Sequence, residues 1–363
     1  MIADKVKKYL EGTGIDIPQA RMDTALELMR RSMNRNLGDN SGERTTRKVR
    51  LPRPSGTWAC GREIVFKSLA LEGEPYGWRS RLTFTHGDIT EAFGVLLFRQ
   101  ALDWLEQTDV LVTPDEDGTQ LNLDVMINPA DWGVAGEPFR MKGSMDMTLR
   151  GHDGGEDVAD WKALSVYGFN DLQAGAEDSS NGWWDKERSG YIAQVRWYMM
   201  MLRVSGRGKG ERGYLVAVNK NTGHLAEALI KADTAAEVDL IRKAVYTQWM
   251  VEEAAERRAI VLQDRTDEGS GGSDLILAEW VRDNVPRARF TANMVKDRPG
   301  NNKRPDGTKG PCLELDTSKA ADPEAFRCSY CDFTQHCWPD FSVVPMAKPV
   351  YRTCGDIQPD AIR

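Results

Sequence analysis

The stretch PFRMKGSMDMTLRGHDGGEDVADWKALSVY, residues 138–167, alternates apolar and polar residues on both sides of a short polar segment. Alternation with a period of two is typical of β-strands. The segment HDGG, residues 152–155, supplies the residues of a turn. We therefore expect a β-hairpin whose strands are residues 138–151 and 156–167.

Acidic and basic side chains recur within this hairpin. Asp160 and Lys162 lie two residues apart, so both project from one face of the strand while Trp161 points to the other. Pairing can bring Asp146 of the preceding strand close to them. Carboxylates that crowd together repel each other unless a hard cation such as Mg²⁺ joins them. A neighbouring lysine can then orient or deprotonate a metal-bound water and stabilise charge on a phosphate oxygen.

The same pair also has a simpler interpretation. An acid and a base two residues apart occur by chance on solvated strand faces, where they contribute little. Apolar residues flank Asp160 and Lys162, however, so we expect a mostly buried strand in which the pair needs partners.

Four short motifs follow one another in the order found in the PD-(D/E)XK nucleases of the RecB and phage-exonuclease type, which the chain resembles over roughly residues 57–230. In chain order they are Gly87 and Glu91 (G-x-x-x-E), Gly143 and Asp146 (G-x-x-D), Asp160 and Lys162 (D/E-x-K), and Gln194 and Tyr198 (Q-x-x-x-Y). Met145 stands where the family name has proline, a departure the family tolerates.

The resemblance implies an α/β, restriction-endonuclease-like core, with a mixed central sheet flanked by helices. It also implies roles: Glu91, Asp146 and Asp160 would bind Mg²⁺ or Mn²⁺ together with the Trp161 carbonyl, and Lys162 would position the attacking water. Gln194 would orient the lysine or contact the scissile phosphate, and Tyr198 would support its helix or stack near DNA. Two alternatives remain: Glu91 as a solvated helix residue and Tyr198 as a packing residue. His86 is a minor candidate for the metal.

Three cysteines, Cys328, Cys331 and Cys337, form a C-x2-C-x5-C cluster near the C-terminus. The segment around them is too polar for thiols that merely fill a core, and clustered thiols outside an exported chain more often bind metal. A subset of the same family, including the AddB subunit and the Cas-type adaptation exonucleases, has this pattern together with one early cysteine. That resemblance implies a [4Fe–4S] cluster in which Cys60 is the fourth ligand. A zinc site completed by Cys312 or His336 is the alternative.

The organisation expected along the chain is a helical N-terminal region with a basic arm (1–55), a nuclease core (56–265), and a linker with a cysteine-rich, metal-binding region (266–363). Within them we expect helices in residues 1–40, a helix from about His86, a helix over 189–204 and a strand over 212–220. A long helix capped by Asp233 or Thr234 and a flexible connector over 267–274 follow.

The 363 residues carry a net charge of −7, which argues against indiscriminate attraction of the whole surface to nucleic acid. No apolar run approaches the length of a membrane span, and the N-terminus lacks a secretory apolar region, so we expect a soluble, cytoplasmic protein (in the host cytoplasm if phage-encoded).

Local basic segments and tryptophans could still hold a phosphate backbone and unpaired bases. The candidates are Arg47, Lys48, Arg50, Arg53, Arg203, Arg207, Lys209, Arg212, Lys296, Arg298, Lys303, Arg304, Lys309, Trp183, Trp184 and Trp197. Solvated loops and core packing are the alternatives for each.

Together these features predict a metal-dependent DNA nuclease, an exonuclease that acts on DNA with free ends in recombination, repair or end processing, in contact with recombination or replication proteins. The alternative is a nucleic-acid-binding protein that keeps the fold and a structural iron–sulfur or zinc site but does not cut.

Overall fold

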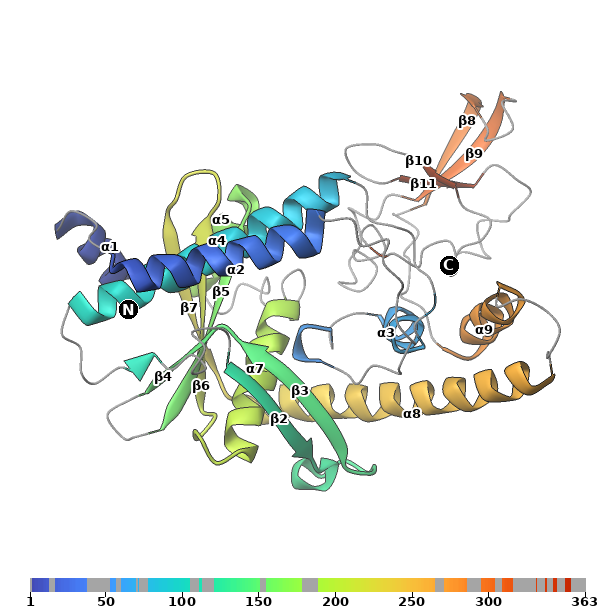
Figure 1. The fold of residues 1–363 in the computed structure, drawn as a ribbon. Coiled ribbons are helices and arrows are strands. Elements are labelled where there is room, and N and C mark those ends of the chain that lie inside the picture. The colour runs from blue at the N-terminus through green and yellow to red at the C-terminus, as the bar shows by residue number, and fades with distance from the viewer. Residues whose placement is uncertain are drawn as a thin grey trace. The chain divides into compact units, whose positions relative to one another are not determined.

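The computed structural model describes residues 2–12, 17–37, 53–56, 60–69, 71, 78–104, 111–112, 121–150, 155–177, 189–264, 271–285, 295–303, 309–315, 331, 337, 342–344 and 350–353 (Figure 1). The chain divides into two compact units. Unit 1 comprises Met1–Thr45, Arg53–Thr57 and Tyr76–Val245, and unit 2 comprises Thr46–Pro52, Trp58–Pro75 and Tyr246–Arg363.

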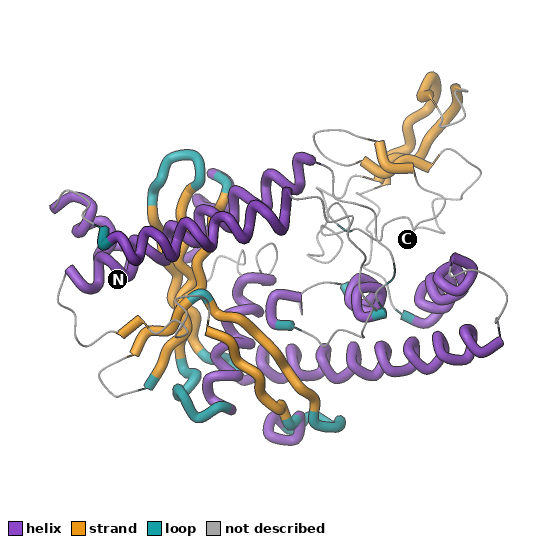
Figure 2. Tube along the Cα trace, viewed as in Figure 1, coloured by secondary structure: helices purple, strands orange, loops and turns teal. Residues whose placement is uncertain are grey.

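A mixed five-stranded sheet forms the centre of unit 1 (Figure 2). Its order is β1-β4-β5-β6-β7, and every neighbouring pair is antiparallel except β5 and β6. The strands are β1 (Leu111–Val112), β4 (Met147–Arg150), β5 (Glu156–Leu164), β6 (Arg212–Asn219) and β7 (Leu225–Lys231). The predicted hairpin is thus confirmed as β4–β5, and a mixed α/β fold with helices beside the sheet is observed.

The first half of the expected hairpin is not one strand but two. Residues Phe139–Met145 form β3, which pairs with β2 (Leu121–Ile127) in a separate two-stranded sheet. Only after Asp146 does the chain join β5, beginning with Met147 opposite Ala159. The alternating pattern runs through the break without interruption, so it carries no sign of it.

Helices cover both faces of the five-stranded sheet. Helices α1 (Ile2–Gly12) and α4 (Trp78–Trp104) pack on one face, and α2 (Gln19–Leu37) runs along α4. Helix α7 (Ser189–Val204) packs on the other face, together with the β2–β3 sheet. Helix α5 (Val166–Glu177) follows β5, and η1 (Pro54–Gly56) and η2 (Pro129–Trp132) are short 3₁₀ turns.

The core of unit 1 follows the period of two in β5. Val158 packs toward α7 and the β2–β3 sheet, whereas Ala159 and Trp161 pack toward α1 and α4. Asp160 and Lys162 therefore share the α7 side with Val158. This places the two charged residues between a sheet and a helix, where each must find a polar partner.

Several expectations need correction. Helix α4 begins at Trp78, well before His86, and the sequence did not predict α5. The expected connector over 267–274 overlaps α9 (Gly271–Asn284). The long helix was predicted correctly: α8 (Thr234–Asp264) is capped by Asp233, whose Oδ1 accepts the backbone N–H groups of Ala235 and Ala236.

In unit 2, α3 (Gly61–Ser68) and α9 pack with the second part of α8. Their buried side chains include Val65, Phe66, Met250, Leu277 and Val281. A four-stranded sheet of order β10-β11-β9-β8 contains β8 (Val295–Lys303), β9 (Lys309–Leu315), β10 (Ser342–Val344) and β11 (Val350–Thr353), strands that the sequence had not predicted. None of the helices in the described part of the chain is long and apolar enough to cross a membrane.

Candidate functional site

Asp146 lies between β3, which belongs to the two-stranded sheet, and β4, which belongs to the central sheet. Its side chain is buried, and its Oδ2 accepts the backbone N–H of Trp161 at 2.8 Å. Because the chain turns away here, the carboxylate satisfies a donor of β5 that a continuing strand would otherwise pair. The break between β3 and β4 therefore determines the orientation of the Asp146 carboxylate.

Lys162 places its ammonium group among oxygen atoms. Its Nζ lies 2.6 Å from Asp160 Oδ2 and 3.9 Å from Asp146 Oδ2, and it donates to the Trp161 carbonyl at 3.2 Å. Asp160 is only 1% exposed, so its carboxylate depends on these protein partners rather than on water.

Glu91 enters the same group from helix α4. Burial and, next, the charge of Asp146, to which Glu91 is hydrogen-bonded, raise the pKa of Glu91 to about 9. Burial also raises the pKa of Asp160 to about 7, with Lys162 opposing the shift. Three carboxyl groups therefore share one ammonium group, and each additional negative charge is costly.

Lys162 is protonated in this arrangement. Burial lowers its pKa, but the charges of Asp160, Asp146 and Glu91 outweigh burial and leave the pKa well above its usual value. The protonated lysine donates hydrogen bonds to the oxygens around it, which fits the expected role of orienting a water.

Helix α7 supplies a second line of hydrogen bonds. Gln194 Nε2 donates to Asp160 Oδ1 at 3.4 Å and to the Tyr198 hydroxyl at 3.2 Å. The Tyr198 hydroxyl donates to the Ser144 carbonyl at 2.6 Å. This series of hydrogen bonds links Asp160 on β5 to the backbone two residues before Asp146. It thereby fixes the positions of the two carboxylates relative to each other. Tyr198 is 2% exposed and cannot stack on DNA in this structure, so its role is support.

Two glycines allow these contacts. A Cβ at Gly143 would lie 2.8 Å from the Tyr198 ring, so only glycine lets that ring lie against β3. A Cβ at Gly94, one turn after Glu91, would lie 2.1 Å from the Trp161 indole. Gly94 thus lets α4 approach β5 closely enough for Glu91 to reach Asp146. Gly87, by contrast, has open space around it and no steric reason to be glycine.

The donor set suits a hard divalent cation. Carboxylate oxygens are the ligands that Mg²⁺ and Mn²⁺ prefer, and such an ion would favour the charged forms of Glu91 and Asp160, whose pKa burial and the neighbouring carboxylates raise. Among the residues that the structure describes, no three Asp, Glu, His or Cys side chains already form a cation-binding group. The Lys162 ammonium supplies the positive charge between Asp146 and Asp160 instead.

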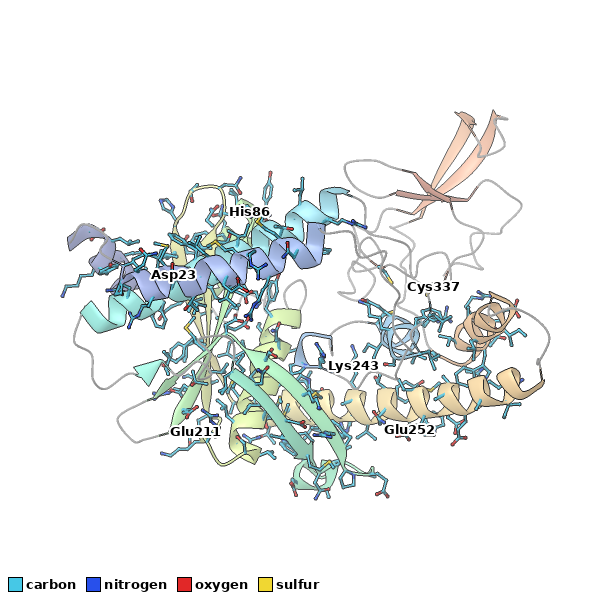
Figure 3. The ribbon with its side chains drawn as sticks, in the orientation of Figure 1. Asp23, His86, Glu211, Lys243, Glu252 and Cys337 are labelled. Atoms are coloured by element: carbon cyan, nitrogen blue, oxygen red, sulfur yellow. The ribbon has the colours of Figure 1, made fainter. Side chains whose placement is uncertain are left out.

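Other candidates lie elsewhere. His86 is exposed on α4 and takes no part in the contacts above (Figure 3). Trp197 was expected to be able to stack on bases, but it is fully buried and packs edge-on against Phe139 with ring centroids 6.4 Å apart. Arg53 and Lys209 are exposed.

Three arginines of the segment 203–212 form ion pairs with acidic residues of unit 1. The partner carboxylates offset part of the attraction that these arginines could have for phosphate. The pairs are Arg203 with Glu237, Arg207 with Glu156, and Arg212 with Asp157. For Lys296, Arg298, Lys303, Lys309 and Cys312 the structure describes the backbone only. Cys328, His336, Trp183, Trp184, Arg47, Lys48, Arg50 and Arg304 lie outside the described residues.

Cys60, Cys331 and Cys337 of unit 2 lie beside one hydrophobic cluster, and Cys60 interacts with Cys337. Cys60 is the N-cap of α3, and its sulfur accepts the backbone N–H of Glu63 at 3.5 Å. Cys331 and Cys337 pack against the cluster that contains Val65 and Phe66 of α3. Burial raises the pKa of the Cys337 thiol to about 12, and the neighbouring Cys60 adds to the shift.

Arg62 joins this region to α9. Its Nε donates to the Val285 carbonyl at 2.7 Å, and its Nη2 donates to the Arg282 carbonyl. Its guanidinium also lies beside Cys337 and lowers the pKa of that thiol. The buried arginine thus satisfies carbonyls at the end of α9 and faces a sulfur at the same time.

No family model matches the sequence, and no curated protein matches it. The fold is similar to several solved structures. The crystal structure of SSO0001 has 16% identity and a TM-score of 0.33, covering 62% of this chain and 85% of that one. An alkaline exonuclease from Laribacter hongkongensis has 16% identity and a TM-score of 0.35, covering 59% and 96%. A second structure of that enzyme contains dAMP.

A phage-related exonuclease from Haemophilus somnus 129PT has 11% identity and a TM-score of 0.28, covering 57% of this chain and 96% of that one. Similarity at these values does not assign an activity to this chain.

The role of Gly94 can be tested by substitution on one helix. We expect Gly94→Ala to lower the free energy of unfolding by about 1–3 kcal/mol, because the added methyl group collides with the Trp161 indole. Gly87→Ala is the matched control. It meets open space and should raise the free energy of unfolding by up to about 1 kcal/mol, since alanine favours a helix. Urea denaturation measures both. Equal effects of the two substitutions would contradict the close approach of α4 to β5.

Proposed function

We propose that the chain is a Mg²⁺- or Mn²⁺-dependent deoxyribonuclease, and specifically an exonuclease that acts on DNA ends. The observation that carries the proposal is the convergence of Glu91 on α4, Asp146 between β3 and β4, and Asp160 and Lys162 on β5, at one location where both aspartates are buried. A cluster of carboxylates with one lysine suits phosphodiester hydrolysis. In that reaction a metal cation and a hydrogen-bond donor must both face the phosphate. The preference for ends rests on the motif order shared with phage exonucleases.

In this mechanism Glu91, Asp146 and Asp160 would hold the ion. When bound, such an ion would supply a lowered pKa for a water molecule and positive charge facing the phosphate. Lys162, protonated by its acidic surroundings, donates to the attacking water or to a phosphate oxygen on which charge develops. Gln194 and Tyr198 hold Asp160 and the β3 backbone in place, so that the carboxylates do not have to reorganise during the reaction.

Cleavage assays on labelled DNA test this proposal. With Mg²⁺ or Mn²⁺ the parent should degrade linear DNA and leave closed circles intact. Lys162→Ala should lose roughly 10²- to 10³-fold in rate, the usual effect of removing a donor that stabilises the transition state. Lys7→Ala, at an exposed position on α1, serves as the control and should retain the parent's rate. If the parent and Lys162→Ala cut equally, this active site is wrong. If the parent binds DNA without cutting it, the non-cleaving alternative is correct.

We also propose that Cys60, Cys328, Cys331 and Cys337 hold a [4Fe–4S] cluster. Three observations support this site. Cys60 and Cys337 are close enough to interact electrostatically, Cys331 and Cys337 pack against the same core as α3, and the Cys60 sulfur accepts a backbone N–H at the start of that helix. A cluster at these residues would connect segments far apart in the sequence, and its binding free energy would add to the stability of unit 2.

Metal analysis of two cysteine variants decides between the possible sites. Protein purified without oxygen should be brown and contain iron, and Cys60→Ser should lose the iron. Cys312→Ser is the matched control and should keep it. Zinc in place of iron, with Cys312→Ser losing the metal and Cys60→Ser keeping it, would contradict the cluster and establish the local zinc site instead.

A further inference from the structure

The side chain of Tyr191 contacts the lysine of the proposed site. Tyr191 lies on α7, three residues before Gln194 and seven before Tyr198. Residues at these spacings lie on one face of a helix. The Lys162 Nζ lies 5.8 Å from the centroid of the Tyr191 ring, within the range of a cation–π interaction. One face of α7 therefore touches the lysine, Asp160 and the Ser144 carbonyl through successive side chains.

The other described partners of Lys162 are oxygen atoms that could bind a divalent ion instead of the ammonium group. Asp160 and Asp146 are the carboxylates that would turn toward a divalent ion, and the Trp161 carbonyl is a candidate ligand as well. A ring face does not bind Mg²⁺ in place of oxygen, so Tyr191 is the partner whose contact with the ammonium survives when the oxygens bind an ion. The lysine side chain is 16% exposed and Tyr191 is partly buried, which strengthens the attraction by excluding water.

We infer that Tyr191 is a positioning residue, whose ring holds the Lys162 ammonium on the α7 side of the site while the carboxylates bind the cation. The inference deepens the proposed nuclease function and rests on it. The hydroxyl group has no part in this role. The ring supplies the interaction through its negative face, so phenylalanine can replace tyrosine and an aliphatic side chain cannot.

A series of ring substitutions tests this role. Fluorine atoms withdraw electrons from the ring face and weaken its attraction for a cation while the shape changes little. Tyr191→Phe should keep the DNA cleavage rate within about twofold of the parent. Replacing that Phe by its mono-, di- and trifluorinated forms should lower kcat stepwise by roughly three- to tenfold in total, with little change in KM. The kcat of Tyr191→Leu should be about as low as that of the trifluorinated variant. A flat series would overturn the inference, since packing alone does not respond to the charge of the ring face.

A double-mutant cycle tests the contact between Tyr191 and Lys162 independently of the proposed nuclease function. Unfolding equilibria of the parent, Tyr191→Leu, Lys162→Met and the double variant are measured with EDTA present. The inference predicts that the two substitutions are coupled by more than about twofold in the unfolding equilibrium constant. Additive effects would contradict it. The cycle requires no cleavage, so it decides whether the ring holds the lysine even if the chain fails to cut DNA and the proposed function falls.

Discussion

The structure of unit 1 depends on the ion pair between the Lys162 ammonium and the Asp160 carboxylate, 2.6 Å apart in the interior of the sheet. Asp160 is almost completely buried, and a buried charge needs a charged or hydrogen-bonding partner. With Asp146 and Glu91 added, three carboxyl groups meet one ammonium group, and ionisation of all three would leave an excess of negative charge. Such an arrangement opposes stability by itself, and its presence in a packed core is best explained by chemistry that uses it.

Each neighbouring element serves to maintain this group of charges. The break between β3 and β4 lets the Asp146 carboxylate replace a ladder hydrogen bond to Trp161. Gly94 lets α4 lie against that tryptophan, and α7 closes the other side with Gln194. A helix, a strand break and a strand interior thus position groups that are far apart in the sequence.

The features that could be predicted from the sequence are those set by the residue pattern within a single segment. The period of two gave the β4–β5 hairpin and placed Asp160 and Lys162 on one face opposite Trp161. The order of motifs named the side chains that the structure brings together. Strand pairing predicted that Asp146 lies near Lys162, whereas Gln194, expected to orient the lysine, donates to Asp160 instead. The break at Asp146 left no signal, because apolar and polar residues keep alternating through it. The roles of Gly94 and Tyr191 arise from packing between α4, β5 and α7, which a pattern within one segment does not contain.

Calorimetric titration with Mn²⁺ at pH 6 and pH 8 tests most directly whether these carboxylates bind a cation together. The raised pKa values, about 9 for Glu91 and about 7 for Asp160, mean that both groups hold protons at pH 6 and must release them to bind metal. We predict binding at least about tenfold tighter at pH 8, with proton release, and its loss in Asp160→Asn. Binding that is independent of pH, or unchanged in Asp160→Asn, would contradict a shared cation site.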